Sequence, residues 1–181
     1  EARPNREQMT IVHGLANETS GGEHTFYIDK GWSGRSSAVP MLNHALIEPA
    51  TVKGVSIDSL LADMPLESAR VFYKLDIEGY EESALKGMAE VRRRCGSRIG
   101  YMEFNDEWLE KAGTDVDRFL AFLQQHYHVY MHYNETLLLQ FTHWRLDRIR
   151  KYYGVNTDLL VATDPADVAA LGLRIRRIRN G

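Results

Sequence analysis

The chain has 181 residues, of which 44% are hydrophobic and 26% are charged, and its formal net charge is −3 at pH 7. This composition is that of an ordinary globular protein, and the length suffices for one domain with a substantial core. The small net charge gives no electrostatic basis for a nucleic-acid partner, and no apolar run approaches the ~20 residues of a membrane span. The single cysteine, Cys95, excludes an internal disulfide framework. We therefore expect a cytoplasmic protein without nucleic-acid or membrane partners; a homo-oligomer stays open.

Apolar runs and turn residues divide the chain into short elements. The strands that we expect are residues 10–16, 25–28, 51–55, 70–76, 98–104, 129–131, 136–141 and 158–163. The helices that we expect are residues 59–64, 81–94, 116–127 and 143–153. Residues 29–50 show no period, which predicts a long loop. Because strands alternate with helices, the order favours an α/β fold with a mostly parallel sheet and an antiparallel edge at the late strand pair.

Capping residues mark several helix ends. Asp58 can cap the helix at 59–64, and Thr114 with Asp117 resembles a capping box. The helix at 81–94 has acids in its first turn and three arginines in its last turn, which suits the helix dipole.

The most informative segment is residues 71–82, with the sequence VFYKLDIEGYEE. It predicts a buried strand that ends in an acidic turn and continues into a helix. Open α/β sheets place their chemistry at the carboxyl ends of strands, so Asp76, Glu78 and Glu81 mark a candidate active site. The simpler explanation is that these acids decorate a helix N-terminus, and this explanation remains the preferred one for Glu81.

The sequence KLDIEGYE at residues 74–81, with Leu-Lys-Gly at 85–87, resembles the FkbM-type family of S-adenosylmethionine-dependent methyltransferases. The flanking segments 55–61 and 101–104 are similar to the family's strands on either side of the motif. The resemblance covers about residues 1–163 and is strongest from 52 to 104. We therefore assign residues 1–163 to a methyltransferase domain and residues 164–181, which hold four arginines, to a basic tail.

The resemblance implies a Rossmann-like class I methyltransferase sheet with S-adenosylmethionine as cofactor. It also implies a small hydroxylated acceptor such as a sugar or a natural product. On the cofactor side it assigns Glu1 to the ribose and Ala16, Asn17 and Glu18 to the adenine. The family's first strand and glycine-rich turn should precede residue 1, so we expect the sheet to lack its first strands in this chain.

Transfer of a methyl group to a hydroxyl requires that the acceptor lose its proton, and a carboxylate can take it. Asp76 is best placed to face the methyl group or the acceptor, Glu78 could share the cleft, and Glu103 could reach it from the next strand. Gly79 lets the backbone bend and approach a ligand. Three convergent carboxylates could instead hold Mg²⁺, an alternative that we do not favour.

Other features have simpler explanations. Lys74, within an apolar strand, fits a salt bridge with a carboxylate such as Glu103. His126, His128 and His132 fit surface positions better than a metal site, because nothing indicates supporting residues. For the whole chain, the rival to an enzyme is a non-catalytic methyltransferase-like module that binds a ligand or a partner protein.

Overall fold

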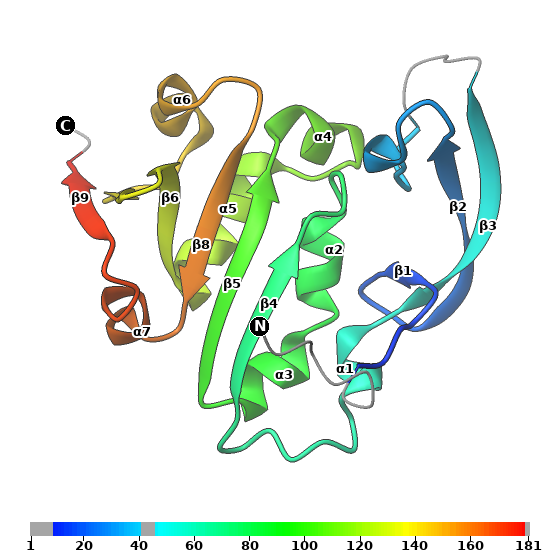
Figure 1. Cartoon of the computed structure of the whole chain (residues 1–181), viewed down its shortest axis with the longest axis horizontal. Coiled ribbons are helices and arrows are strands. Elements are labelled where there is room, and N and C mark those ends of the chain that lie inside the picture. Colours follow the sequence, from blue (N-terminus) through cyan, green and yellow to red (C-terminus); the bar gives the residue numbers. More distant parts are fainter. Residues whose placement is uncertain (1–8, 41–45, 180–181) are drawn as a thin grey trace, which may run out of the picture.

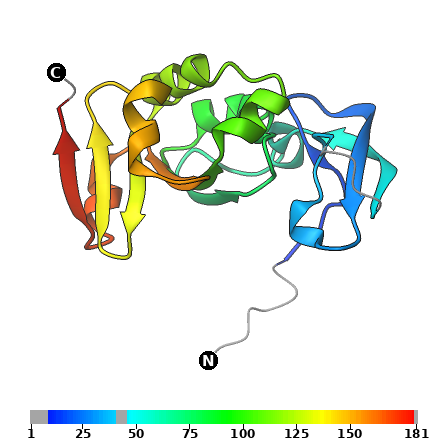
Figure 2. The same cartoon turned by 90° about the horizontal axis from the view of Figure 1, so that it is seen from above.

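The computed structural model describes residues 9–40 and 46–179, and within them the strands form two sheets (Figure 1). The smaller sheet has the order β1-β3-β2 and the larger has the order β4-β5-β8-β6-β7-β9. The strands are β1 (Leu15–Ala16), β2 (Gly21–Asp29), β3 (Ile47–Val55), β4 (Arg70–Leu75), β5 (Ser97–Phe104), β6 (His128–Asn134), β7 (Leu137–Phe141), β8 (Thr157–Ala162) and β9 (Arg174–Ile178). In Figure 2 the smaller sheet lies at one end of the molecule and β9 at the other.

Short helices connect these strands. They are α1 (Ile57–Leu60), α2 (Glu81–Lys86), α3 (Ala89–Arg94), α4 (Asp106–Lys111), α5 (Val116–His126), α6 (Leu146–Ile149) and α7 (Pro165–Ala169), with the 3-10 turns η2 (Ser33–Arg35) and η3 (Arg150–Tyr152). None of the helices in the described residues has the length and apolar character needed to cross a membrane.

The larger sheet is mixed, and our expectation of a mostly parallel sheet is wrong. Only the pairs β4–β5 and β7–β9 are parallel, whereas β5–β8, β8–β6 and β6–β7 are antiparallel. The cause is the β6–β7 hairpin, which reverses the chain before residues 142–156 cross back. The strand that follows this crossover, β8, therefore runs opposite to both of its neighbours.

The main core lies between the larger sheet and helices α2 to α6, which cover one of its faces (Figure 2). Side chains alternate along β5, so that Met102 and Phe104 are fully buried under these helices while Tyr101 and Glu103 point to the opposite face. On that opposite face a smaller core forms where Val168 of α7 packs on neighbouring strands. β4, which precedes the acidic turn, pairs with β5. The helices that pack on this sheet therefore also support the strand from which the turn begins.

The expected helix at 81–94 is interrupted. It divides into α2 and α3 at Gly87, where a Cβ atom would lie 2.2 Å from the backbone oxygen of Asn17. The backbone after β1 thus occupies the space that a side chain at this position would fill. Asp58 does not cap α1, whose cap is Ser56; its carboxylate instead accepts hydrogen bonds from the first backbone N–H groups of α3.

Three further segments differ from the sequence-based prediction. Residues 47–50, expected in a loop, belong to β3, which lies in the middle of its sheet. The cap of α5 is Asp115, while the Thr114 hydroxyl donates to Glu82. The segment 164–181, expected as a basic tail, carries α7 and β9, and β9 pairs with β7.

Candidate active site

Two neighbouring parallel strands bring acidic side chains to one edge of the larger sheet. Leu75 is paired with Met102, so Asp76 follows β4 at the level where β5 carries Glu103. Asp76, Glu78 and Glu103 can each place a carboxylate oxygen so that all three oxygens lie within 4.8 Å of one another. The structure therefore brings together the three side chains that the sequence marks as catalytic candidates.

The turn that presents these groups has an unusual backbone. Glu78 has φ 55°, the one positive value for a non-glycine among the described residues, and Gly79 follows with φ 98°. The hydroxyl of Ser37 donates to the backbone oxygen of Glu78 at 2.9 Å. Residues other than glycine rarely adopt a positive φ, so contacts around Glu78 must hold its backbone in this conformation. Such backbone strain is often found at functional sites.

The electrostatics of Glu78 follow from its surroundings. Burial, and after it the charges of Glu103, Asp76 and Glu81, together raise the pKa of its carboxyl from 4.5 to about 7. A carboxyl with a pKa near neutrality can both accept and release a proton at pH 7. Glu78 is thus better suited to general acid–base work than an ordinary surface glutamate.

Glu81 supports the turn from inside. Its side chain is 2% exposed, and its Oε1 accepts from the backbone N–H groups of Ile77 at 3.2 Å and Gly79 at 3.4 Å. Burial raises the pKa of its carboxyl to about 7, against the opposing effect of these hydrogen bonds. Glu81 occupies the first turn of α2, as expected, but it is buried and holds the acidic turn in place.

Asp76 and Glu103 each have a polar partner. Lys74 donates to Asp76 Oδ2 at 2.5 Å, so this lysine is salt-bridged, although to Asp76 rather than to Glu103. The side chain of Asn156 donates to Glu103 Oε1. Burial raises the pKa of Glu103, and the charges of Asp76 and Asp158 act in the same direction.

Sequence reasoning missed a polar group on β8 and its neighbours. Asp158 pairs with Glu103 on one side and with His132 on the other in the strand register. The hydroxyl of Tyr101 donates to Asp158 Oδ2 at 2.9 Å and lies 2.9 Å from His132 Nδ1. Together with Glu103, these residues form a row of polar side chains across β5, β8 and β6, next to the acidic cluster.

A recess beside this row is lined mainly by aromatic and polar side chains. Its volume is about 260 Å³. Its walls include Tyr133, Tyr152, Tyr153, Asn156 and Asp158. Because Asn156 also bonds Glu103, the recess adjoins the acidic cluster.

A second recess lies on the side of the expected cofactor residues and has a volume of about 240 Å³. Asn17 and Gly79 both line it. Asn17 is tied to α2, because its Oδ1 accepts from the Ser83 hydroxyl at 2.7 Å, and the backbone N–H of Glu18 donates to the same hydroxyl at 3.3 Å. Ala16 is half-buried in β1, and Glu1 lies outside the described residues.

The donor sets allow two kinds of ligand. Asp76, Glu78 and Glu103 offer hard oxygen ligands that could hold a divalent cation, although acidic clusters of this kind are common without an ion. The recess at Asn17 fits a polar cofactor in part: it offers amide and hydroxyl groups and the ion pair of Lys86 with Glu82, and Gly79 adds backbone free of a side chain.

The fold and the site together define an α/β protein with an acid–base cluster at the carboxyl ends of two parallel strands. Residues 4–130 match the model of the FkbM methyltransferase domain, which is well over half of the chain. The chain therefore belongs to the FkbM methyltransferase domain family, and the resemblance found in its sequence is confirmed. No curated protein and no solved structure matches the chain. The matched segment ends within β6, so β7, β8 and β9 lie beyond it.

Proposed function

We propose that this protein is an S-adenosylmethionine-dependent O-methyltransferase that acts on a small hydroxylated molecule. The observation that carries the proposal is the convergence of Asp76, Glu78 and Glu103 at the strand ends of a chain from the FkbM methyltransferase domain family. Carboxylates at that edge can accept the proton that a hydroxyl must lose when it is methylated.

In the proposed mechanism the acceptor hydroxyl lies against the acidic cluster. Glu78 takes its proton, because a carboxyl with a pKa of about 7 is partly ionised at neutral pH and still basic enough to act. Asp76 and Glu103 accept hydrogen bonds that orient the acceptor, and Lys74 and Asn156 hold them in place. S-Adenosylmethionine supplies, when bound, a methyl group activated by its sulfonium.

The two recesses are the proposed binding sites of the cofactor and the acceptor. The recess at Asn17 and Gly79 is the candidate for the cofactor. Ala16 and Glu18 flank Asn17 in the chain, and Glu1 is the proposed ribose ligand. The recess lined by Tyr133, Tyr152 and Tyr153 is the candidate for the acceptor, since aromatic side chains with polar tips suit a hydroxylated ring.

Cofactor binding is tested by thermal unfolding of the purified full-length protein with S-adenosylhomocysteine. A ligand at about 100 times its Kd stabilises the folded state by about 2.7 kcal/mol. For a chain of this size that corresponds to a rise in Tm of roughly 5–10 °C. An unchanged Tm would contradict the proposal and favour the non-catalytic binding module.

Catalysis is tested with Asp76→Asn. Loss of this carboxylate, which orients the acceptor, should lower the rate of S-adenosylhomocysteine formation with hydroxylated acceptors by about 10²-fold while the Tm stays close to that of the parent. The matched control is Asp63→Asn, which changes an exposed carboxylate in the loop after α1 and should retain full activity. Equal rates for the two variants would remove Asp76 from the mechanism.

A further inference from the structure

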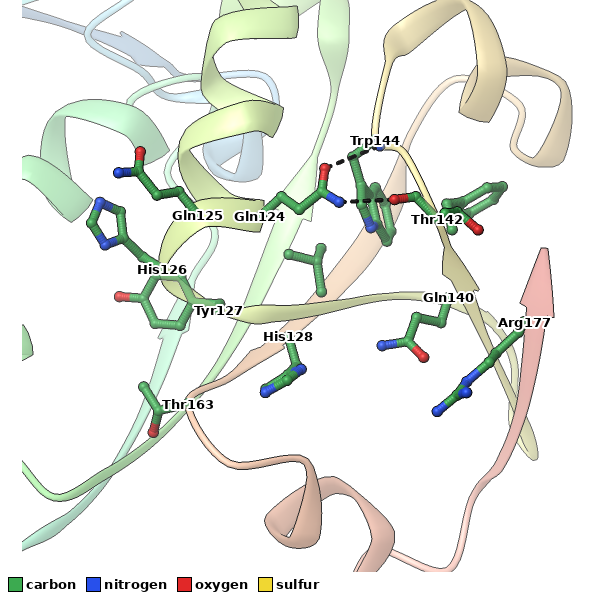
Figure 3. Close-up of a pocket in the computed structure, with 12 residues that line it drawn as sticks. Gln124, Gln125, His126, Tyr127, His128, Gln140, Thr142, Trp144, Thr163 and Arg177 are labelled. Atoms are coloured by element: carbon green, nitrogen blue, oxygen red, sulfur yellow. Dashed lines mark hydrogen bonds between the residues drawn. The ribbon is translucent and has the colours of Figure 1, made fainter. Parts of the chain in front are cut away.

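A cavity of about 510 Å³ is shown in Figure 3. It lies at the end of the larger sheet where β5 and β6 begin, whereas the acidic cluster lies at the carboxyl ends of β4 and β5. The cavity is bounded by the C-terminal end of α5, the start of β6, the end of β7 and the end of β9. The register pairs His128 with Ala162 and Ala162 with Ile99, which places this cavity where β5 and β6 begin. Its volume falls within the range of ordinary small-molecule sites.

Among the described residues, the lining of this cavity is rich in hydrogen-bond donors and contains no carboxylate. It includes Arg177, His126 and His128 together with amide and hydroxyl side chains, and no Asp or Glu. Arg177 and Gln140 are paired in the strand register, and Figure 3 shows them pointing to the same side of the sheet as His128. No carboxylate of the described residues forms an ion pair with Arg177, so its charge is available to a ligand.

A second cation, Arg98 of β5, lies on the same side of the sheet as Met102 and so faces the helices, away from the side to which Arg177 points. Arg98 is only 7% exposed, its Nη1 donates to the backbone oxygen of Cys95, and its Nε has no partner in the described structure. Its backbone exchanges hydrogen bonds with Thr163, which lines the cavity. Arg98 therefore lies near the cavity but is not one of its ligands.

We propose that this cavity binds a small molecule that carries a phosphate group. Arg177, His128 and Gln140 come from three adjacent strands and can each donate to a different oxygen of a tetrahedral anion. The volume leaves room for a body attached to the phosphate, such as a sugar. Gln140 of β7 and Arg177 of β9 lie beyond the part of the chain that matches the FkbM domain, whereas His128 lies within it.

The experiment is isothermal titration of the purified protein with ribose 5-phosphate, inorganic phosphate and ribose. We expect ribose 5-phosphate to bind and ribose not to bind. Equal affinity for inorganic phosphate would identify the free anion as the ligand, and weaker binding of inorganic phosphate would identify a phosphorylated metabolite. Absence of binding by both phosphate compounds would overturn the proposal.

Variants locate the site. Arg177→Gln should weaken binding about tenfold, because one charge-assisted hydrogen bond is lost. The matched control is Arg176→Gln, since this arginine is the next residue of β9 and points to the other face of the sheet; its affinity should change less than about twofold. Equal losses in the two variants would show that only the general charge of β9 matters and would overturn the proposal. Gln140→Leu, which keeps every charge, should also weaken binding, and unchanged affinity would contradict the assigned position.

Discussion

The buried carboxyl of Glu81 makes the stability of the fold depend on pH, and Glu81→Gln should remove this dependence. The folded protein holds the pKa of this group at about 7, above the ordinary 4.5. The folded state therefore binds the proton more tightly than the unfolded chain does. The stabilising contribution is complete below pH 4.5 and is lost as the pH rises through 7.

The magnitude follows from the two values. A difference of one in pKa between the folded and unfolded states corresponds to about 1.4 kcal/mol of stability. The increase in the pKa of Glu81 from 4.5 to about 7 therefore corresponds to about 3 kcal/mol, in a residue that is 2% exposed. Glutamine is neutral and keeps the oxygen that accepts from Ile77 and Gly79. The variant should thus exceed the parent in free energy of unfolding by about 3 kcal/mol at pH about 8.5, and by nearly nothing at pH about 4.

Urea unfolding of both proteins at the two pH values measures this difference directly. The control is Glu110→Gln, an exposed carboxylate on α4, which should change the free energy of unfolding by less than about 0.5 kcal/mol at either pH. If the difference between Glu81→Gln and the parent is the same at both pH values, the carboxyl is not held neutral by burial and the reasoning fails.

Two further predictions concern the turn itself. If Glu78 is the proposed base, the rate of methyl transfer should rise with pH through about 7 and then level off, because the base must be ionised; Glu78→Gln should lose this dependence, and an unchanged pH profile would rule the residue out. Gly79→Val should lower the free energy of unfolding by about 2 kcal/mol or more, since the residue has φ 98° and a Cβ would lie 2.7 Å from the backbone oxygen of Trp108. Denaturant unfolding measures it, and a variant as stable as the parent would contradict the conformational argument.

The acidic turn was predictable from local sequence, because a buried strand, closely spaced acids and a glycine are all visible within residues 71–82. The proximity of Glu103 was also predictable, since it ends the next strand and parallel strands end at a common edge. The burial of Glu81 was not predictable, because a first-turn acid looks the same in sequence whether it faces solvent or the protein interior.

Asn156 and Asp158 escaped prediction for a topological reason. They precede the bulk of β8, and the amino end of a parallel strand would have placed them at the edge far from Glu103. The β6–β7 hairpin inverts β8, so its start meets the end of β5. Local periodicity reports whether a segment is a strand but not its direction in the sheet, and direction decided which polar groups join the site. The same limit applies to β9, whose three arginines resemble a solvated segment until the pairing with β7 is known.

The close contact between Gly87 and the backbone of Asn17 joins the smaller sheet to the helices of the larger sheet. The chain leaving β1 enters the helical layer of the larger sheet at this point, and the Ser83 hydroxyl fastens it there. Separation of the smaller sheet would leave a gap between α2 and α3 and strip α2 of its contact with Asn17. The helix that follows the acidic turn, α2, is therefore held in part by Asn17 and Glu18, which lie some sixty positions earlier in the chain.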